Sequence, residues 1–143
     1  SHDPRYLPDL LAALGSADMV LGSRAVAGGR DDDRPWWRRL ITLFANLYIR
    51  IILGLPVMDC NSGYRCFRRK VLDTIGLDTL TSRGPGIVQE VLYRVHLKGF
   101  RIAEVPISFV ERKKGQSKLG FQHLFTGYIL ILKLRLLRLL GKI

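Results

Sequence analysis

The sequence is poor in two kinds of residue whose presence defines whole classes of protein. Its 143 residues include two cysteines, Cys60 and Cys66, which are too few for a disulfide framework and lack metal-site spacing. No acidic residue follows Glu111. The cysteine content indicates a reducing, cytosolic setting, and the missing acids leave the last part of the chain strongly basic.

Long apolar runs, internal repeats and targeting segments are also missing. The apolar stretch 128–132 is interrupted by Lys133, well short of the roughly 20 residues that a membrane-spanning helix requires. An interfacial helix is therefore favoured there over a transmembrane one. No signal peptide is visible and the chain does not begin with Met, so we expect it to be part of a longer protein.

Apolar and basic residues are plentiful. Hydrophobic residues make up 48% of the chain, so it should bury a core as a single domain. The formal net charge is +11, and residues 36–143 hold 19 Lys and Arg against six Asp and Glu. This excess predicts an anionic partner: a nucleic acid, a membrane surface or a phosphorylated substrate.

Hydrophobic periodicity and turn residues predict an α/β order of elements. They place helices over 8–14, 36–53, 71–75, 87–98 and 121–140, and strands over 17–23, over 103–109 and directly after a turn near 58–63. We expect the strands to form a parallel sheet.

The predicted 36–53 helix carries two lines of side chains. A wide apolar stripe recurs at three- and four-residue spacing: Trp37, Leu40, Ile41, Phe44, Leu47, Tyr48, Ile51 and Ile52. A polar line has four-residue spacing: Arg38, Thr42, Asn46 and Arg50. Two interpretations stay open. The helix is an ordinary core-facing helix with a wet polar side, or it lies in a membrane interface with Trp36 and Trp37 at headgroup depth.

The stretch 104–120 combines a predicted strand with a basic turn. Apolar residues alternate along the strand, and the turn after it holds Arg112, Ser117 and Lys118 among other cations. Backbone N–H groups, a hydroxyl and cations are what a phosphate or diphosphate requires. A solvated basic turn is the alternative. Arg24 adds a further cation directly after the 17–23 strand, at the end where α/β sheets collect ligands.

Two acidic residues are candidates for a chemical role. Asp59 lies just before a turn, where a carboxylate caps backbone N–H groups or acts as a base, and capping is the more common use. Glu90 lies beside Gln89 in a predicted helix, where most Glu side chains are solvated. Three consecutive acids at 31–33 lie in a glycine-containing loop and more often face water than bind a metal.

Taken in order, these segments resemble the polyprenol-phosphate glycosyltransferases, the dolichol-phosphate mannosyltransferase-like members of glycosyltransferase family 2. The matching pieces are Gly22-Ser23-Arg24, Gly28-Gly29, the helix over 36–46, Asp59 to Arg65 and Glu104 to Leu119. The resemblance covers nearly the whole chain. It implies the C-terminal part of a GT-A-type (nucleotide-diphospho-sugar transferase) α/β sandwich over 1–120, without its nucleotide-binding first half. This part includes an amphipathic interfacial helix over 36–54, and a basic amphipathic helix follows over 121–143.

The resemblance also implies an activity. Enzymes of this family move a hexose, here most simply mannose or else glucose, from a nucleoside-diphosphate sugar to a polyprenyl phosphate at the cytosolic membrane face. Residue by residue, the resemblance assigns the acceptor phosphate to Arg24, Arg38 and Thr42, the donor diphosphate to Arg112, Ser117 and Lys118, and catalysis to Asp59 and Glu90.

The metal and the partners follow from the same resemblance. The family holds Mg²⁺ or Mn²⁺ with an Asp-x-Asp motif, which would fall just before Ser1, so we expect this chain to hold no metal. We therefore expect the chain alone not to transfer sugar, and to self-associate or bind a complementary N-terminal chain at an open sheet edge. The competing functions are a non-catalytic basic membrane-surface module and a nucleic-acid-binding module. The sequence contains no recognised nucleic-acid motif, so nucleic acid is not an expected partner.

Overall fold

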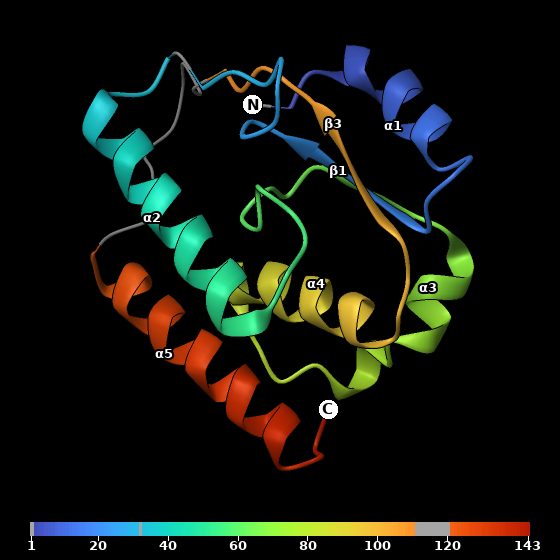
Figure 1. The fold of residues 1–143 in the computed structure, drawn as a ribbon, viewed down its shortest axis with the longest axis vertical. Coiled ribbons are helices and arrows are strands. Elements are labelled where there is room, and N and C mark those ends of the chain that lie inside the picture. Colours follow the sequence, from blue (N-terminus) through green and yellow to red (C-terminus); the bar gives the residue numbers. More distant parts are fainter. Residues whose placement is uncertain (1, 32, 111–120) are drawn as a thin grey trace.

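The computed structural model describes residues 2–31, 33–110 and 121–143. Its elements are η1 (Pro4–Tyr6), α1 (Leu7–Ala13), β1 (Met19–Ser23), α2 (Trp36–Leu53), β2 (Arg65–Phe67), α3 (Arg69–Thr74), η2 (Leu77–Thr79), η3 (Gly84–Gly86), α4 (Ile87–Leu97), β3 (Ile102–Pro106) and α5 (Phe121–Leu139) (Figure 1). The predicted α/β order is confirmed. The last strand is shorter than predicted, because it ends at Pro106 and not at residue 109.

The three strands form one mixed sheet in the order β2-β1-β3. β1 pairs parallel with β3, with Met19 opposite Ile102, and antiparallel with β2, with Met19 opposite Phe67. The expectation of a parallel sheet is therefore wrong for β2. The main-chain N–H of Gly22 donates to the carbonyl of Tyr64, so β2 starts beside the end of β1 and runs back along it.

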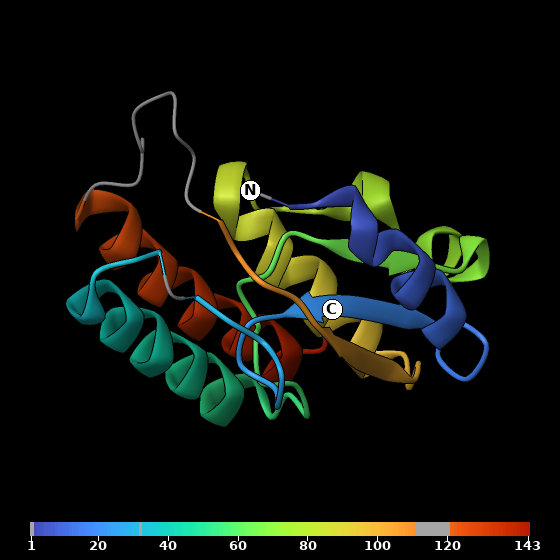
Figure 2. The ribbon, with the colours of Figure 1, turned by 90° about the horizontal axis from the view of Figure 1, so that it is seen from above.

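Helices cover both faces of the sheet (Figures 1 and 2). Alternate residues of β1 point to opposite faces, as in any pleated strand. Met19 and Leu21 belong to the larger core, which α2, α3, α4 and α5 complete, whereas Val20 packs with Leu10 of α1. Burial on both faces explains why β1 is a continuous apolar run.

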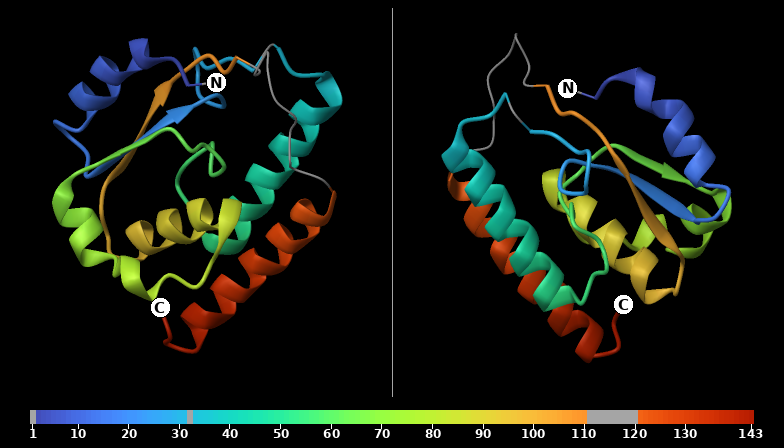
Figure 3. Two further views of the ribbon diagram at one scale, coloured as in Figure 1. Left: turned by 180° about the vertical axis from the view of Figure 1, so that it is seen from behind. Right: turned by 45° about the horizontal axis from the view of Figure 1, so that its top comes forward.

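α2 and α5 lie side by side and form one wall of the larger core (Figures 1 and 3). Ile49 of α2 and Leu134 of α5 are buried in it. The hydroxyl of Tyr48 donates to the carbonyl of Tyr128 over 3.2 Å, and the centroids of their rings are 4.8 Å apart. Among the described helices, none is both long enough and apolar enough to cross a membrane.

α2 buries one apolar side and exposes another. Ile49 and Leu53 are buried in the larger core, and Tyr48 and Ile52 pack against it. Its outer side is apolar and between 42% and 69% exposed: Trp36, Leu40, Leu43, Phe44, Leu47 and Ile51. The predicted polar line faces inward, where Asn46 is 5% exposed and Thr42 and Arg50 are half-buried. The interpretation of this line as a wet side is therefore wrong for Thr42 and Asn46, because they bind the side chains of Arg34 and Asn61.

Leu134→Ala should lower the free energy of unfolding by about 2–5 kcal/mol, because it leaves a cavity at a fully buried position of the larger core. Leu132→Ala is the matched control on the same helix, since Leu132 is 53% exposed. Urea unfolding followed by circular dichroism measures both variants. Equal losses would show that α5 does not pack on the core with this face.

Candidate functional site

The candidate site lies where β1 and β3 end, beside α2. Because β1 and β3 are parallel, the residues that follow them meet at one edge of the sheet. Arg24 follows β1 directly, and its guanidinium carbon lies 5.3 Å from the centroid of the Phe109 ring, beyond β3. The loop after β1 returns to the same edge, where Arg30 forms a bridge with Ser108.

Two glycines let this loop fold back closely on Arg24. Gly28 has a φ of 87°, a conformation that residues with a side chain rarely adopt. A Cβ at Gly29 would lie 2.7 Å from the carbonyl oxygen of Ser23, closer than any real contact. The two glycines that the sequence pattern singled out therefore shape the loop around the site.

Arg24 and Asp59 form a buried, two-pronged ion pair. The Nε of Arg24 donates to Oδ2 of Asp59 over 2.7 Å, Nη2 donates to Oδ1 over 2.9 Å, and the Arg24 main-chain N–H donates to Oδ2 over 3.2 Å. Burial alone would raise the pKa of Asp59, but the hydrogen bonds and charge of Arg24 outweigh it and hold that pKa below its ordinary value. Asp59 is therefore an ionised anchor for Arg24.

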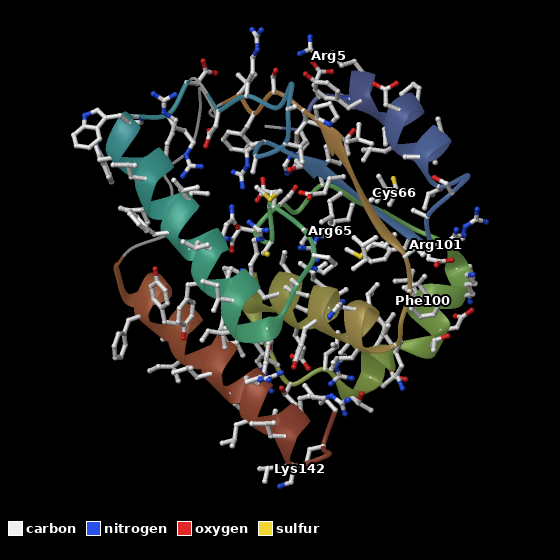
Figure 4. All side chains as sticks on the ribbon, viewed as in Figure 1. Arg5, Arg65, Cys66, Phe100, Arg101 and Lys142 are labelled. Carbon is white, nitrogen blue, oxygen red and sulfur yellow. The ribbon has the colours of Figure 1, made fainter. Side chains whose placement is uncertain are left out.

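Glu104 and Arg65 hold the turn that carries Asp59. The carboxylate of Glu104, on β3, accepts the main-chain N–H groups of Met58 over 2.7 Å and Asp59 over 3.0 Å. Arg65 lies near the middle of the molecule in Figure 4. It donates to the main-chain carbonyls of Cys60 and Ser62 in the turn and of Val88 in α4. Burial lowers the pKa of Arg65 to about 10. Both residues lie in the family pattern, but these roles were not predicted from the sequence.

A second guanidinium, that of Arg34, lies 5.9 Å from the centroid of the same Phe109 ring. It donates to Oδ2 of Asp31 over 2.9 Å and to Oγ1 of Thr42 over 3.0 Å, while Thr42 donates to the carbonyl of Arg38 over 3.0 Å. Sequence reasoning missed Arg34. The signal that could have found it is its spacing, because Arg34 extends the four-residue polar line of α2 by one step.

Two cavities meet at Arg24 and Thr42. The first, of about 560 Å³, lies between α2, the start of α4 and α5, and its apolar wall includes Ile41, Tyr48, Ile49, Leu130 and Ile131. The second, of about 720 Å³, opens along α2, and its apolar wall includes Leu40, Leu43, Phe44 and Leu47. Each cavity combines a cationic end with an apolar wall, which suits a ligand with an anionic head and an apolar body.

A row of three side-chain amides adjoins the first cavity. The polar atoms of Asn46 and Asn61 are 2.7 Å apart, as are those of Asn61 and Gln89. Asn61 and Gln89 line the cavity. The row links α2, the turn and α4, and it explains why Asn46 is buried although it belongs to the polar line of α2.

Glu90 is fully buried and shapes the wall of the first cavity. Its carboxylate accepts the main-chain N–H groups of Thr81 over 3.1 Å and Ser82 over 2.6 Å, and it pairs with Arg94 over 2.8 Å. Burial alone would raise the pKa of Glu90, but the hydrogen bonds from Ser82 and Thr81 and from Arg94 outweigh it and lower that pKa. Since Thr81 and Ser82 line the cavity, these contacts give Glu90 a positioning role, and its catalytic role stays a prediction.

The structure brings together two of the three residues assigned to the acceptor phosphate. Arg24 and Thr42 line both cavities, whereas Arg38 lines neither and its guanidinium carbon lies 5.2 Å from the centroid of the Trp37 ring. Arg39 lines the second cavity. The residues assigned to the donor diphosphate lie outside the described residues: Arg112, Ser117 and Lys118. All of these assignments stay predictions.

Within residues 2–31, 33–110 and 121–143, no three His, Cys, Asp or Glu side chains gather as metal ligands. The two acids that line the second cavity, Asp31 and Asp59, are each paired with a guanidinium. The residues of the site therefore do not fit a divalent metal.

Asp59→Asn should lower the free energy of unfolding at pH 7 by about 3–5 kcal/mol, because it leaves the Arg24 guanidinium without its buried counter-charge. In the variant, the free energy of unfolding should also fall less steeply as the pH is lowered. Asp59 has a lower pKa in the folded than in the unfolded chain, so its stabilisation is complete above about pH 5 and is lost as the pH falls through the folded pKa.

Urea unfolding between pH 3 and pH 7 measures this dependence. Asp73→Asn is the control, since Asp73 is an exposed acid paired with Arg69 on α3 and should keep the wild-type acid dependence. An unchanged acid dependence in Asp59→Asn would contradict the anchoring role of Asp59.

Comparison with known proteins shows what the chain is similar to. It is 45% identical over 120 residues to the undecaprenyl-phosphate mannosyltransferase of Micrococcus luteus, a match covering 84% of this chain and 49% of that protein. It is 41% identical over 121 residues to the polyprenol monophosphomannose synthase of Mycolicibacterium smegmatis, covering 84% and 46%. It is 32% identical over 127 residues to the dolichol-phosphate mannosyltransferase of Pyrococcus furiosus, covering 87% and 35%.

No family model matches the chain. The chain spans about half the length of the first two curated relatives. The resemblance predicted from the motifs is confirmed: the chain is homologous to the polyprenol-phosphate mannosyltransferases, glycosyltransferases of the dolichol-phosphate mannosyltransferase type.

Proposed function

We propose that this chain forms the acceptor-binding part of an enzyme that transfers mannose, from a nucleoside-diphosphate sugar, to a polyprenyl phosphate. The observation that carries the proposal is the junction of the two cavities, where Arg24 and Thr42 lie between apolar walls. A polyprenyl phosphate has the matching shape, an anionic head on an apolar chain. The names of two relatives, an undecaprenyl-phosphate mannosyltransferase and a polyprenol monophosphomannose synthase, support this acceptor and sugar.

In this reaction an oxygen of the acceptor phosphate attacks the anomeric carbon of the sugar. The bond between that carbon and the nucleoside diphosphate breaks, and the diphosphate leaves with the bonding electrons. Because the attacking oxygen is already anionic, the reaction needs no general base, and we assign Asp59 the task of orienting Arg24. The protein's contribution is to hold two anions close together and to offset the charge on the leaving group.

The donor diphosphate is assigned to residues of the basic turn, which lie outside the described residues. We propose that Arg112, Ser117 and Lys118 bind the donor diphosphate, as the motif predicts. The divalent metal that the family implies belongs to the complete enzyme in this proposal, and we assign no step to a metal held by the described residues.

Arg24→Lys should weaken binding of farnesyl phosphate at least tenfold. The lysine keeps the positive charge that Asp59 requires but loses the planar, two-pronged geometry that suits phosphate. Calorimetric titration of the purified chain measures the affinity, and Arg69→Lys on the exposed face of α3 is the matched control.

In the complete enzyme, Arg24→Lys should raise the KM for the lipid acceptor and leave the KM for the donor unchanged. Arg38→Lys should likewise raise the KM for the lipid acceptor, as expected for a residue assigned to the acceptor phosphate. If either variant raised the KM for the acceptor and the KM for the donor equally, acceptor binding by that arginine would be contradicted.

We further propose that the exposed sides of α2 and α5 dock on an anionic membrane surface, at the cytoplasmic face. α5, which packs beside α2, also has exposed apolar residues: Phe125, Ile129, Leu132, Leu136 and Leu139. Three cations, Lys133, Arg135 and Arg138, lie on the same helix, and no acid follows Glu111. An apolar surface flanked by cations suits a bilayer with anionic headgroups. The proposed acceptor is itself a membrane lipid.

Leu43→Glu combined with Ile51→Glu should abolish flotation of the protein with phosphatidylglycerol vesicles at low salt, because both changes place an acid on the exposed side of α2. Leu77→Glu is the matched control, since Leu77 is 47% exposed but lies in η2, outside this surface. The wild type should float, with a blue shift of the fluorescence of Trp36 and Trp37. A double variant that still floats would contradict membrane docking. A wild type that forms dimers and does not float would show that the surface joins two copies of the chain.

A further inference from the structure

We propose that Arg34 is a further anion-binding residue of the acceptor site, and that Asp31 is the internal anion that the acceptor phosphate displaces from it. The inference rests on the proposed function, since its ligand is the phosphate monoester of the proposed acceptor. Neither residue belongs to the motif that predicted the site. In the structure Asp31 lines the second cavity, and Arg34 lines neither cavity but contacts two residues that do, Asp31 and Thr42.

Two guanidinium groups that suit a phosphate lie near the same aromatic ring, and one of them contacts Thr42. The guanidinium carbons of Arg24 and Arg34 lie 5.3 Å and 5.9 Å from the centroid of one ring, that of Phe109. Arg34 also lies beside Thr42, with its Nη2 3.0 Å from Oγ1. Thr42 already donates to the carbonyl of Arg38, so the donors available to a phosphate are the N–H groups of the two guanidiniums that Asp59, Asp31 and Thr42 do not use.

The two arginines are not held equally firmly. Both oxygens of Asp59 accept hydrogen bonds from Arg24, and the Asp59 side chain is only 1% exposed. Asp31 accepts from Arg34 through Oδ2 alone, and its Oδ1 is buried without a hydrogen-bond partner in the described part of the chain. A buried carboxylate oxygen without a partner is unfavourable, so the pair of Asp31 and Arg34 is the weaker of the two.

Asp31 also has a way out of the site. Its side chain is 13% exposed and lines the second cavity, which opens along α2. Once displaced, the carboxylate can reach water through this cavity, while Arg34 keeps its contact with Thr42. The phosphate then takes the place of Asp31 on Arg34, and the Arg24–Asp59 pair stays intact and holds Arg24 in position.

Titration of the purified chain with geranyl phosphate tests the proposal. Arg34→Ala should weaken binding at least tenfold, and Arg34→Lys should weaken it less, because it keeps the charge but not the fork. Asp31→Asn should tighten binding at least threefold, because it removes the competing charge with almost no change in shape. The exposed pair of Arg69 and Asp73 on α3 provides matched controls, and Arg69→Ala and Asp73→Asn should bind within twofold of the wild type.

The outcomes separate this inference from the proposed function. Wild-type affinity in both Arg34 variants, with weakened binding in Arg24→Lys, would overturn the role of Arg34 and leave the proposed function intact. Unchanged or weaker binding by Asp31→Asn would overturn the displacement. A wild type that does not bind geranyl phosphate, or that binds inorganic phosphate equally tightly, would instead contradict the lipid acceptor of the proposed function.

Discussion

The buried ion pair between Arg24 and Asp59 is the interaction on which the rest of the site depends. A buried charge without a partner is costly, so the end of β1 and the turn before β2 must stay together. Glu104 then fixes this turn to β3, and Asn61 of the same turn joins it to α2 and α4 through the row of amides. The edge of the sheet, the turn and two helices are thus positioned around one cation.

The inward polar line of α2 sets the orientation of the whole helix. Thr42 and Asn46 face the site, and Ile49 and Leu53 face the larger core. The remaining apolar residues of α2 therefore face outward, where Phe44 is 61% exposed. So large an exposed apolar surface is unfavourable in water unless another apolar phase covers it. The proposed acceptor would contact both sides of the helix. Its phosphate would bind at the polar side, and its lipid chain would lie in the membrane that covers the exposed apolar side.

Helices and strands were predictable because their signals are local. The three- and four-residue spacing of apolar residues placed α2 at its observed bounds, and Gly54, with its left-handed φ, ends the helix where predicted. The direction of β2 was not predictable, since it depends on where the turn packs beside β1. For the same reason the spacing of α2 did not reveal which part of its apolar stripe is buried in the core and which part is exposed. Arg38 fits the motif but lies over Trp37, while Arg34, outside the motif, reaches Thr42.

The sequence by itself determined the elements, the excess of positive charge and the likeness to polyprenol-phosphate glycosyltransferases, because these follow from neighbouring residues and ordered motifs. Only the tertiary structure decided which charges are already paired. Asp59 and Glu90 look alike in the sequence as isolated acids, yet one anchors a site arginine and the other supports a cavity wall through the main chain of Thr81 and Ser82. A carboxylate becomes an anchor, a support or a base according to the donors around it, and those donors come from segments far apart in the chain.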